Sequence, residues 1–187
     1  IMCGEGRKKR RIPLANSPLT RNGSIGFQVE NAMAVIATGW ALGYSWEVIE
    51  RALAGFVSDA QTAPGRFNVF DYRGATLIAD YGHNPDAIQA LVAGIDNMPA
   101  RRRSVVISGA GDRRDDDIRQ QTQILGDAFD EVILYQDACQ RGREDGEVIS
   151  LLRDGLTGAK RTGSVDEITG EFIAIDTALE RLGSGDL

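Results

Sequence analysis

Apolar residues recur at helical spacing in the first third of the chain. Between Val29 and Val57 they return every three or four positions, which is typical of amphipathic helices. One helical face is formed by Ala32, Val35, Ile36 and Gly39. A second helix is predicted over GYSWEVIERALAGF (43–56), with Ser45 as its N-cap. Its inward positions are predicted to be Val48, Ile49, Leu53 and Phe56.

A polar segment, SDAQTAPGR (58–66), interrupts this pattern. It contains proline and glycine, which are typical of domain linkers. We therefore predict a boundary between a domain at residues 1–62 and a second domain at residues 63–187. Beyond the boundary, FNVFDYRGATLIAD (67–80) predicts two strands around a turn at Arg73-Gly74.

Short apolar runs and helical stripes alternate along the rest of the chain. Strands are predicted at 104–111 and 131–137, and helices at 85–97, 116–129, 146–156 and 165–182. This alternation favours an α/β fold, a Rossmann-like, mostly parallel sheet with helices on both faces. The last residues, ERLGSGDL (180–187), follow a turn signal where the alternation would next supply a strand. We therefore expect the second domain to lack its last strand.

Composition and charge restrict the function classes. The chain is 42% hydrophobic and 26% charged, as in soluble globular proteins. Its formal net charge of −6 argues against nucleic-acid binding, which requires a basic face. No apolar run approaches the ~20 residues that span a bilayer, and a signal-peptide pattern is absent. We expect a cytoplasmic protein with no membrane partner. One histidine and two distant cysteines argue against a zinc site, and no metal ligand is assigned.

Three predicted strands are followed by polar clusters. These are DYGHN (80–84), SGAGDRRDDD (108–117) and QDACQRGRED (136–145). In an open α/β sheet, ligands bind beyond the carboxyl ends of the strands. Each cluster is therefore a candidate site.

In the first cluster, helix-capping preferences account for Asn84, Pro85 and Asp86. They leave Asp80 and His83 unexplained. Asp80 directly follows a strand, where a carboxylate can accept hydrogen bonds from a ribose. His83, the only histidine, lies beside a helix N-terminus, where ligand sites concentrate. From the residues alone, a structural and a ligand-binding role for His83 carry equal weight.

The other two clusters have ordinary explanations as well. SGAG has no third glycine for a GxGxxG motif, because Arg114 stands at that position, and no GK[ST] follows. Tight turns need glycine in any case, and Arg113-Arg114 beside three aspartates fits a salt-bridged helix start. Composition favours a solvated loop for 136–145. Its mixed charges also suit a zwitterionic or cationic small molecule, because guanidinium groups pair with carboxylates.

Five stretches, in order and spacing, resemble the Mur ligase family, and most closely the C-terminal part of its cyanophycin synthetases. The stretches are ENAMAVIATGWALG (30–43), APGRFNVF (63–70), LIADYGHNPDA (77–87), SGAGDRRDDDIRQ (108–120) and VILYQDACQRGREDGE (132–147). The combination of GDRRDDDIR with RGREDGE is the more selective pointer to the cyanophycin synthetases.

The resemblance implies an ATP-dependent carbon–nitrogen ligase. Members of the family activate a carboxylate as an acyl phosphate, which an amine attacks to leave an amide, ADP and phosphate. Cyanophycin synthetases join arginine to the aspartate side-chain carboxylate of an aspartate polymer. Residues 63–187 then resemble the family's C-terminal domain, and residues 1–62 a mainly helical remnant of its ATP-binding central domain. The parent enzyme is expected to be a homo-oligomer.

The resemblance also places the site residues. It implies that Asn31, Arg66, Asp80, His83 and Asn84 face ATP, with Asn31 towards adenine, Arg66 towards the phosphates and Asp80 towards the ribose. It assigns the amino-acid substrate to Asp112, Arg113, Asp137, Arg141, Arg143 and Glu144. The phosphate loop and most magnesium ligands belong to family parts not found here. We therefore expect no complete catalytic set and negligible activity from this chain alone.

Three alternatives remain at this point. A different Mur-type ligase, such as a cell-wall tripeptide ligase or a folylpolyglutamate synthetase, is disfavoured by RGREDGE, since the cell-wall relatives carry another motif there. A dinucleotide-binding module built on SGAGDRR is disfavoured by the missing third glycine. A non-catalytic interaction domain is also possible, because a fold does not determine a function.

Overall fold

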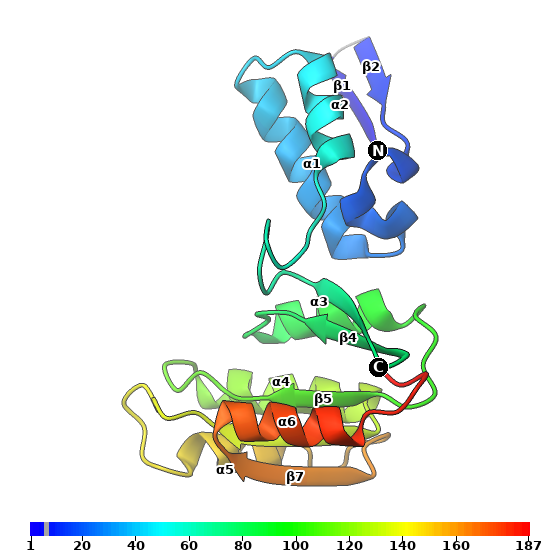
Figure 1. Ribbon diagram of the computed structural model, residues 1–187. Helices are drawn as coiled ribbons and strands as arrows, with labels where there is room; N and C mark the ends of the chain where they lie inside the picture. The colour runs from blue at the N-terminus through cyan, green and yellow to red at the C-terminus, as the bar shows by residue number, and fades with distance from the viewer. Residues whose placement is uncertain (6–7) are drawn as a thin grey trace. The chain divides into compact units, whose positions relative to one another are not determined.

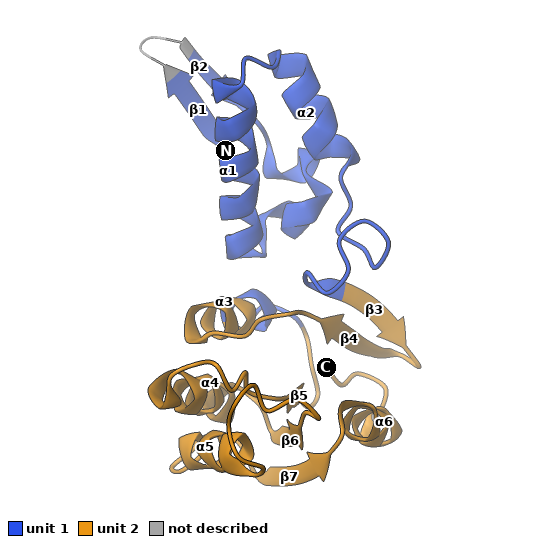
Figure 2. Ribbon diagram, turned by 90° about the vertical axis from the view of Figure 1, so that its left-hand side faces the viewer, with its two compact units in different colours: residues 1–68, 93–98 blue, residues 69–92, 99–187 orange. Residues whose placement is uncertain are grey.

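The structure, a computed structural model, describes residues 1–5 and 8–187. These residues form two compact units (Figure 2). Unit 1 consists of residues 1–68 and 93–98, and unit 2 of residues 69–92 and 99–187. No helix within the described ranges is long and apolar enough to cross a membrane.

Unit 1 combines two antiparallel strands with helices. Its elements are β1 (Met2–Glu5), β2 (Lys8–Arg11), two short 3₁₀ helices, η1 (Leu14–Asn16) and η2 (Pro18–Gly23), and the helices α1 (Gly26–Ala41) and α2 (Trp46–Gly55). Its core is formed by the residue that follows β2 and by residues of α1 and α2: Ile12, Ala32, Ile36, Ile49 and Leu53. The two predicted helices are therefore present, and their apolar faces pack on each other.

The predicted N-cap of α2 is confirmed, because Ser45 Oγ accepts a hydrogen bond from Val48 N at 3.4 Å. The inward face is narrower than predicted. Ile49 and Leu53 are buried, but Val48 is 38% exposed and Phe56 41% exposed. Phe56 lies beyond the last helical residue, so the helical period no longer directs it inward. On α1, Val35 is exposed, whereas Ala32 and Ile36 of the same predicted face are buried.

Unit 2 contains a hairpin formed by β3 (Asn68–Tyr72) and β4 (Ala75–Ala79), although β3's first residue is assigned to unit 1. The two turn residues, Arg73 and Gly74, have φ of 54° and 80°. Two successive positive φ values are the mark of the tight turns that suit twisted hairpins. The predicted turn is therefore confirmed.

A three-stranded parallel sheet, in the order β5-β6-β7, forms the centre of unit 2. Its strands are β5 (Ser104–Ile107), β6 (Glu131–Gln136) and β7 (Ser164–Thr169), and the helices are α3 (Pro85–Ile95), α4 (Asp115–Ala128), α5 (Glu147–Gly155) and α6 (Glu171–Arg181). The helices α4 and α5 cover one face and α6 the other (Figures 1 and 2). This is the predicted α/β fold, a parallel sheet with helices on both faces.

One predicted helix is wrong in its first part. The prediction runs one helix over 165–182, but residues Ser164–Thr169 are β7, which pairs with β6 at six positions. Gly170, with φ of 101°, separates β7 from α6. Apolar residues on both sides of Gly170 happen to keep a helical spacing, so periodicity alone did not separate them.

The chain's last residues lie between the backbones of β4 and β5. Leu187 N donates to Arg102 O at 2.9 Å, and Ser104 N donates to Leu187 O at 2.8 Å, the pattern of parallel strands. On the other side, Thr76 N donates to Asp186 O at 2.9 Å. The tail thus joins the hairpin to the three-stranded sheet. The absence of a further strand stays a prediction.

Candidate functional site

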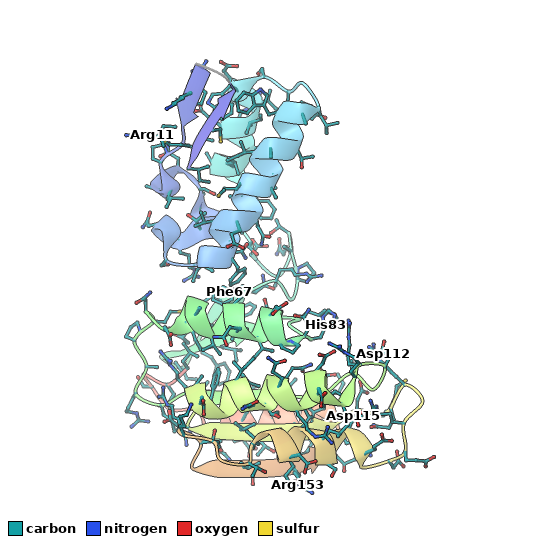
Figure 3. The ribbon with its side chains drawn as sticks, turned by 180° about the vertical axis from the view of Figure 1, so that it is seen from behind. Arg11, Phe67, His83, Asp112, Asp115 and Arg153 are labelled. Atoms are coloured by element: carbon teal, nitrogen blue, oxygen red, sulfur yellow. The ribbon has the colours of Figure 1, made fainter. Side chains whose placement is uncertain are left out.

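Three loops lie at the carboxyl ends of β4, β5 and β6 in unit 2. They are residues 80–84, 108–114 and 137–146. Figure 3 shows His83, Asp112 and Asp115, which come from two of these loops and the start of α4, at one end of the unit. This is the edge at which open α/β sheets bind ligands.

The loop after β4 ends in a helix cap. Asn84 Oδ1 accepts a hydrogen bond from Ala87 N at 2.8 Å, and Asn84 O accepts one from Ile88 N at 3.1 Å. The capping role of Asn84 is therefore confirmed. A Cβ on Gly82 would lie 3.1 Å from Asp80 Oδ1, so the glycine lets the Asp80 carboxylate approach the backbone.

His83 is held from two sides. Its Nδ1 lies 3.1 Å from Tyr81 O, so a proton on Nδ1 would leave Nε2 as the acceptor. The two rings lie with centroids 5.2 Å apart. On the main chain, His83 O accepts a hydrogen bond from Gln121 Nε2 of α4 at 3.2 Å. Gln121 is only 1% exposed, and its signal in the sequence is a polar residue on the apolar face shared by Ile118 and Leu125.

Arg141 connects all three loops. Its Nη1 lies 3.3 Å from Asp112 Oδ1. A hydrogen bond with Tyr81, followed by the charge of Asp112, raises the pKa of Arg141. Arg141 and Gly142 have φ of 51° and 91°, a left-handed turn that favours glycine and strains Arg141. The Asp112–Arg141 pair is half exposed, since 55% and 46% of the two side chains are accessible.

Arg143 contacts two backbone carbonyls and two carboxylates. Its Nε donates to Gly111 O at 2.7 Å and its Nη2 to Arg113 O at 2.7 Å. It also forms ion pairs with Asp115 at 2.8 Å and Glu147 at 2.5 Å. Glu147, followed by Asp115, raises the pKa of Arg143.

The other predicted substrate residues lie on the same loops. Asp137 Oδ1 accepts a hydrogen bond from Cys139 N at 3.3 Å, and Glu144 N donates to Glu147 Oε2 at 3.2 Å. Burial raises the pKa of Tyr135 to about 12, and the negative charges of Glu171 and Asp137 contribute to this rise. The structure therefore brings the substrate candidates together at one edge, while their roles stay predictions.

The glycines of SGAG are explained by packing. A Cβ on Gly109 would lie 2.8 Å from Val148 Cγ1, and one on Gly111 would lie 2.0 Å from Gln140 O. Arg114 forms the expected salt-bridged helix start, with Nη2 2.8 Å from Asp117 Oδ1. The ordinary explanation thus accounts for these three residues. Arg113, next to them, is exposed.

The nucleotide candidates divide between the two units. Asn31 and Arg66 belong to unit 1, whereas Asp80, His83 and Asn84 belong to unit 2. Asn31 is exposed on α1, and its Nδ2 donates to Gln28 Oε1 at 3.0 Å. Arg66 is exposed too, and its carbonyl accepts a hydrogen bond from Ser58 Oγ at 2.8 Å.

Within unit 2, the carboxylate of Asp80 and the imidazole of His83 are groups that can hydrogen-bond a nucleoside. The SGAG glycines are explained by packing. Within residues 1–5 and 8–187, no group of three or more histidine, cysteine, aspartate or glutamate residues is arranged to hold a metal ion.

The parallel sheet makes unit 2 a Rossmann-like α/β domain, and its polar loops lie at the edge where such folds bind ligands. The model of the Mur ligase, glutamate ligase domain, matches residues 65–187, and the chain belongs to this family. Cyanophycin synthetases from Geminocystis herdmanii and Crocosphaera subtropica are 34% and 32% identical to it over 98% of its length. A UDP-N-acetylmuramoyl-L-alanyl-D-glutamate–2,6-diaminopimelate ligase from Geobacillus kaustophilus is 28% identical over 70% of the chain and 26% of the relative.

The chain spans about a fifth of the cyanophycin synthetases it matches, 21% of each. Among solved structures, a diaminopimelate ligase aligns with a TM-score of 0.57 and 25% identity, over 86% of this chain and 32% of that one. A folylpolyglutamate/dihydrofolate synthase from Yersinia pestis aligns with a TM-score of 0.51 and 25% identity, over 95% of this chain and 43% of that one. These similarities agree with the fold described above.

Proposed function

We propose that this chain is part of an ATP-dependent amide ligase of the cyanophycin synthetase type. The observation that carries the proposal is the 34% identity to a cyanophycin synthetase over 98% of the chain. The cell-wall ligases it resembles are 27–28% identical. Residues 63–187 would be the C-terminal domain and residues 1–62 part of the ATP-binding domain, in an enzyme that works as a homo-oligomer.

The proposed reaction joins arginine to an aspartate side chain of an aspartate polymer. The terminal phosphoryl group of ATP passes to the aspartate carboxylate, giving an acyl phosphate and ADP. The amine then attacks the acyl carbon, phosphate leaves, and the nitrogen loses a proton. Phosphoryl transfer relies on positioning and on neutralising charge, which suits arginine side chains.

Each candidate residue has a part in this proposal. Asp80, His83 and Asn84 would form one wall of the nucleotide site, while Asn31 and Arg66 would contact adenine and the phosphates from unit 1. Because Arg66 is the last residue of the polar segment 58–66, it suits a group delivered by domain closure. The support for the amine site is the cluster of opposite charges around Asp112 and Arg141.

The experiment is an amide-forming assay on the full-length protein. ATP and an aspartate-ended primer are supplied with arginine, diaminopimelate or glutamate, and phosphate release and product mass are followed. We expect turnover with arginine. Turnover with diaminopimelate or glutamate alone would reassign the chain to a cell-wall or folylpolyglutamate type of ligase. No turnover with any amine would contradict the proposal.

A further inference from the structure

Arg143 differs from the other predicted substrate arginines because its guanidinium is hydrogen-bonded to protein groups at every nitrogen. Only 16% of its side chain is exposed, compared with 46% for Arg141, two residues earlier. Guanidinium has five N–H donors in a fixed planar fork. Nε, Nη1 and Nη2 of Arg143 all contact protein acceptors. A side chain engaged at all three nitrogens is poorly placed to bind a ligand.

The acceptors of Arg143 lie in a meaningful order. One accepting carbonyl belongs to Gly111, the residue before Asp112, and the other belongs to Arg113 itself. The two substrate candidates of this loop therefore sit between two pinned carbonyl groups. Asp115, at the start of α4, adds a third contact on the same side.

The loop after β6 is shaped to deliver two arginines to the same neighbour. The left-handed turn at Arg141 and Gly142 separates the two side chains by one residue. Arg141 meets the Asp112 carboxylate at 3.3 Å, while Arg143 meets the backbone around it. One arginine thus contacts the exposed carboxylate, and the other holds the peptide groups that carry it.

Close contact of the two loops is a separate observation. A Cβ at Gly111 would lie 2.0 Å from Gln140 O, a distance that real Cβ atoms do not reach. The backbone after β5 therefore lies directly against the backbone after β6. Only glycine at position 111 allows this approach.

The geometry points to Arg143 as a positioning residue that fixes Asp112 and Arg113, rather than as a ligand of the substrate. Asp112, Arg113 and Arg141 then form the surface that contacts the amine substrate. That second statement rests on the proposed function. The clamp itself depends only on the contacts of Arg143.

The kinetic test uses Arg143→Lys in the full-length protein. Lysine keeps the charge, but its single ammonium group cannot reach acceptors in the three directions of the guanidinium fork. We expect kcat/KM for the amine substrate to fall by about 100-fold, as for a loop displaced by about 1 Å, with KM for ATP unchanged. Arg153→Lys is the matched control, since Arg153 pairs with Glu167 away from this edge (Figure 3), and it should leave both values unchanged.

Hydrogen exchange separates the clamp from the proposed function. In the 187-residue chain, Arg143→Lys should speed exchange at amides 110–115 and 138–144, and Arg153→Lys should not. Gly111→Ala should give the same pattern without a change of charge. Unchanged exchange in both variants would overturn the clamp, whether or not any amine is turned over.

Two kinetic outcomes bear on the positioning role. Faster exchange with unchanged amine kinetics would overturn it. A rise in KM for ATP equal to that for the amine would also overturn it, because a local clamp at Asp112 should act on one substrate. Absence of all turnover in the unaltered protein would instead contradict the proposed ligase function, and the exchange result would still decide the clamp.

Discussion

The two ends of the sheet in unit 2 use guanidinium and carboxylate groups in opposite ways. At the amino ends of β5 and β6, the carboxylates of Glu131 and Asp186 are 6% and 1% exposed and each contacts two arginines. At the carboxyl ends, the Asp112 carboxylate is 55% exposed and contacts Arg141. Buried pairs must stay complete, whereas exposed pairs contribute little to stability and exchange readily. The first end therefore holds the fold, and the second is suited to exchange partners with a ligand.

Arg143 is the exception that sharpens this comparison. It lies at the carboxyl ends of the strands, yet only 16% of its side chain is exposed and it has four partners. The buried group here is the guanidinium, whereas at the amino ends it is the carboxylate. The residue type and its neighbours in sequence do not distinguish it from Arg141. Its partners do.

The largest expected effect is on stability, at the amino end. Asp186 accepts hydrogen bonds from Arg101 Nε at 3.1 Å and Gly183 N at 2.9 Å. We expect Asp186→Ala to lower the free energy of unfolding by about 3 kcal/mol, because a buried network loses its acceptor. Urea unfolding of the 187-residue chain measures this. The control is Asp127→Asn, which breaks an exposed pair with Lys160 and should leave the midpoint unchanged. Equal midpoints for the two variants would erase the contrast between the ends.

The next largest effect is expected on activity, at the carboxyl ends of the strands. We expect Asp112→Asn to reduce kcat/KM for the amine substrate by at least about 10-fold, because a hydrogen bond to a charged group contributes about 1.5–3 kcal/mol. The unfolding midpoint should not move, since the pair with Arg141 is half exposed. Asp116→Asn, at a carboxylate that is 97% exposed on α4, serves as the control. A lower midpoint for Asp112→Asn with normal kinetics would reverse the assignment of the two ends.

A smaller effect is expected at Gln121, a buried residue that contacts the loop after β4. Its Nε2 binds His83 O, while its Oε1 has no hydrogen-bond partner among the described residues. Gln121→Met removes one hydrogen bond and one unpaired acceptor, so the loss of stability should stay within about 1 kcal/mol. KM for ATP should rise by less than about 10-fold, because one neutral hydrogen bond is lost. Gln120→Met, on the exposed side of α4, provides the comparison. A change in KM for the amine alone would show that His83 does not face the nucleotide.

The elements that were predicted correctly are those with local causes. The helix predicted at 116–129 is found at Asp115–Ala128, and the one predicted at 146–156 at Glu147–Gly155, because each carries an unbroken apolar stripe. The hairpin turn and the cap at Ser45 also depend on neighbouring residues. The helix predicted over the residues of β7 was wrong, because the short apolar run of this strand continues into the helical pattern of α6.

The site depends on contacts that sequence does not display. Arg143 reaches a carbonyl 32 residues away, and Gln121 reaches one 38 residues away. Motifs brought these loops to attention as candidates, and the resemblance supplied roles for their residues. Neither the motifs nor the resemblance shows which groups an arginine side chain contacts. Arg141 and Arg143 were therefore assigned the same role. Only the fold separates the arginine that faces solvent from the one that holds the loop.

The smallest expected effect is the pH dependence of the Asp186 network. Burial raises the pKa of Asp186, but hydrogen bonds from Gly183 and Arg101 outweigh it, so the folded-state pKa lies below the ordinary 3.8. The unfolded chain therefore takes up this proton first as the pH falls. The network's contribution is complete above pH 3.8 and is lost as the pH falls through the lower folded-state value. In urea unfolding, the stability gap between the unaltered chain and Asp186→Ala should be constant at neutral pH and narrow in acid. A gap that widens in acid would mean that Asp186 is held protonated, and the amino end would then lack the ion pairs that distinguish it.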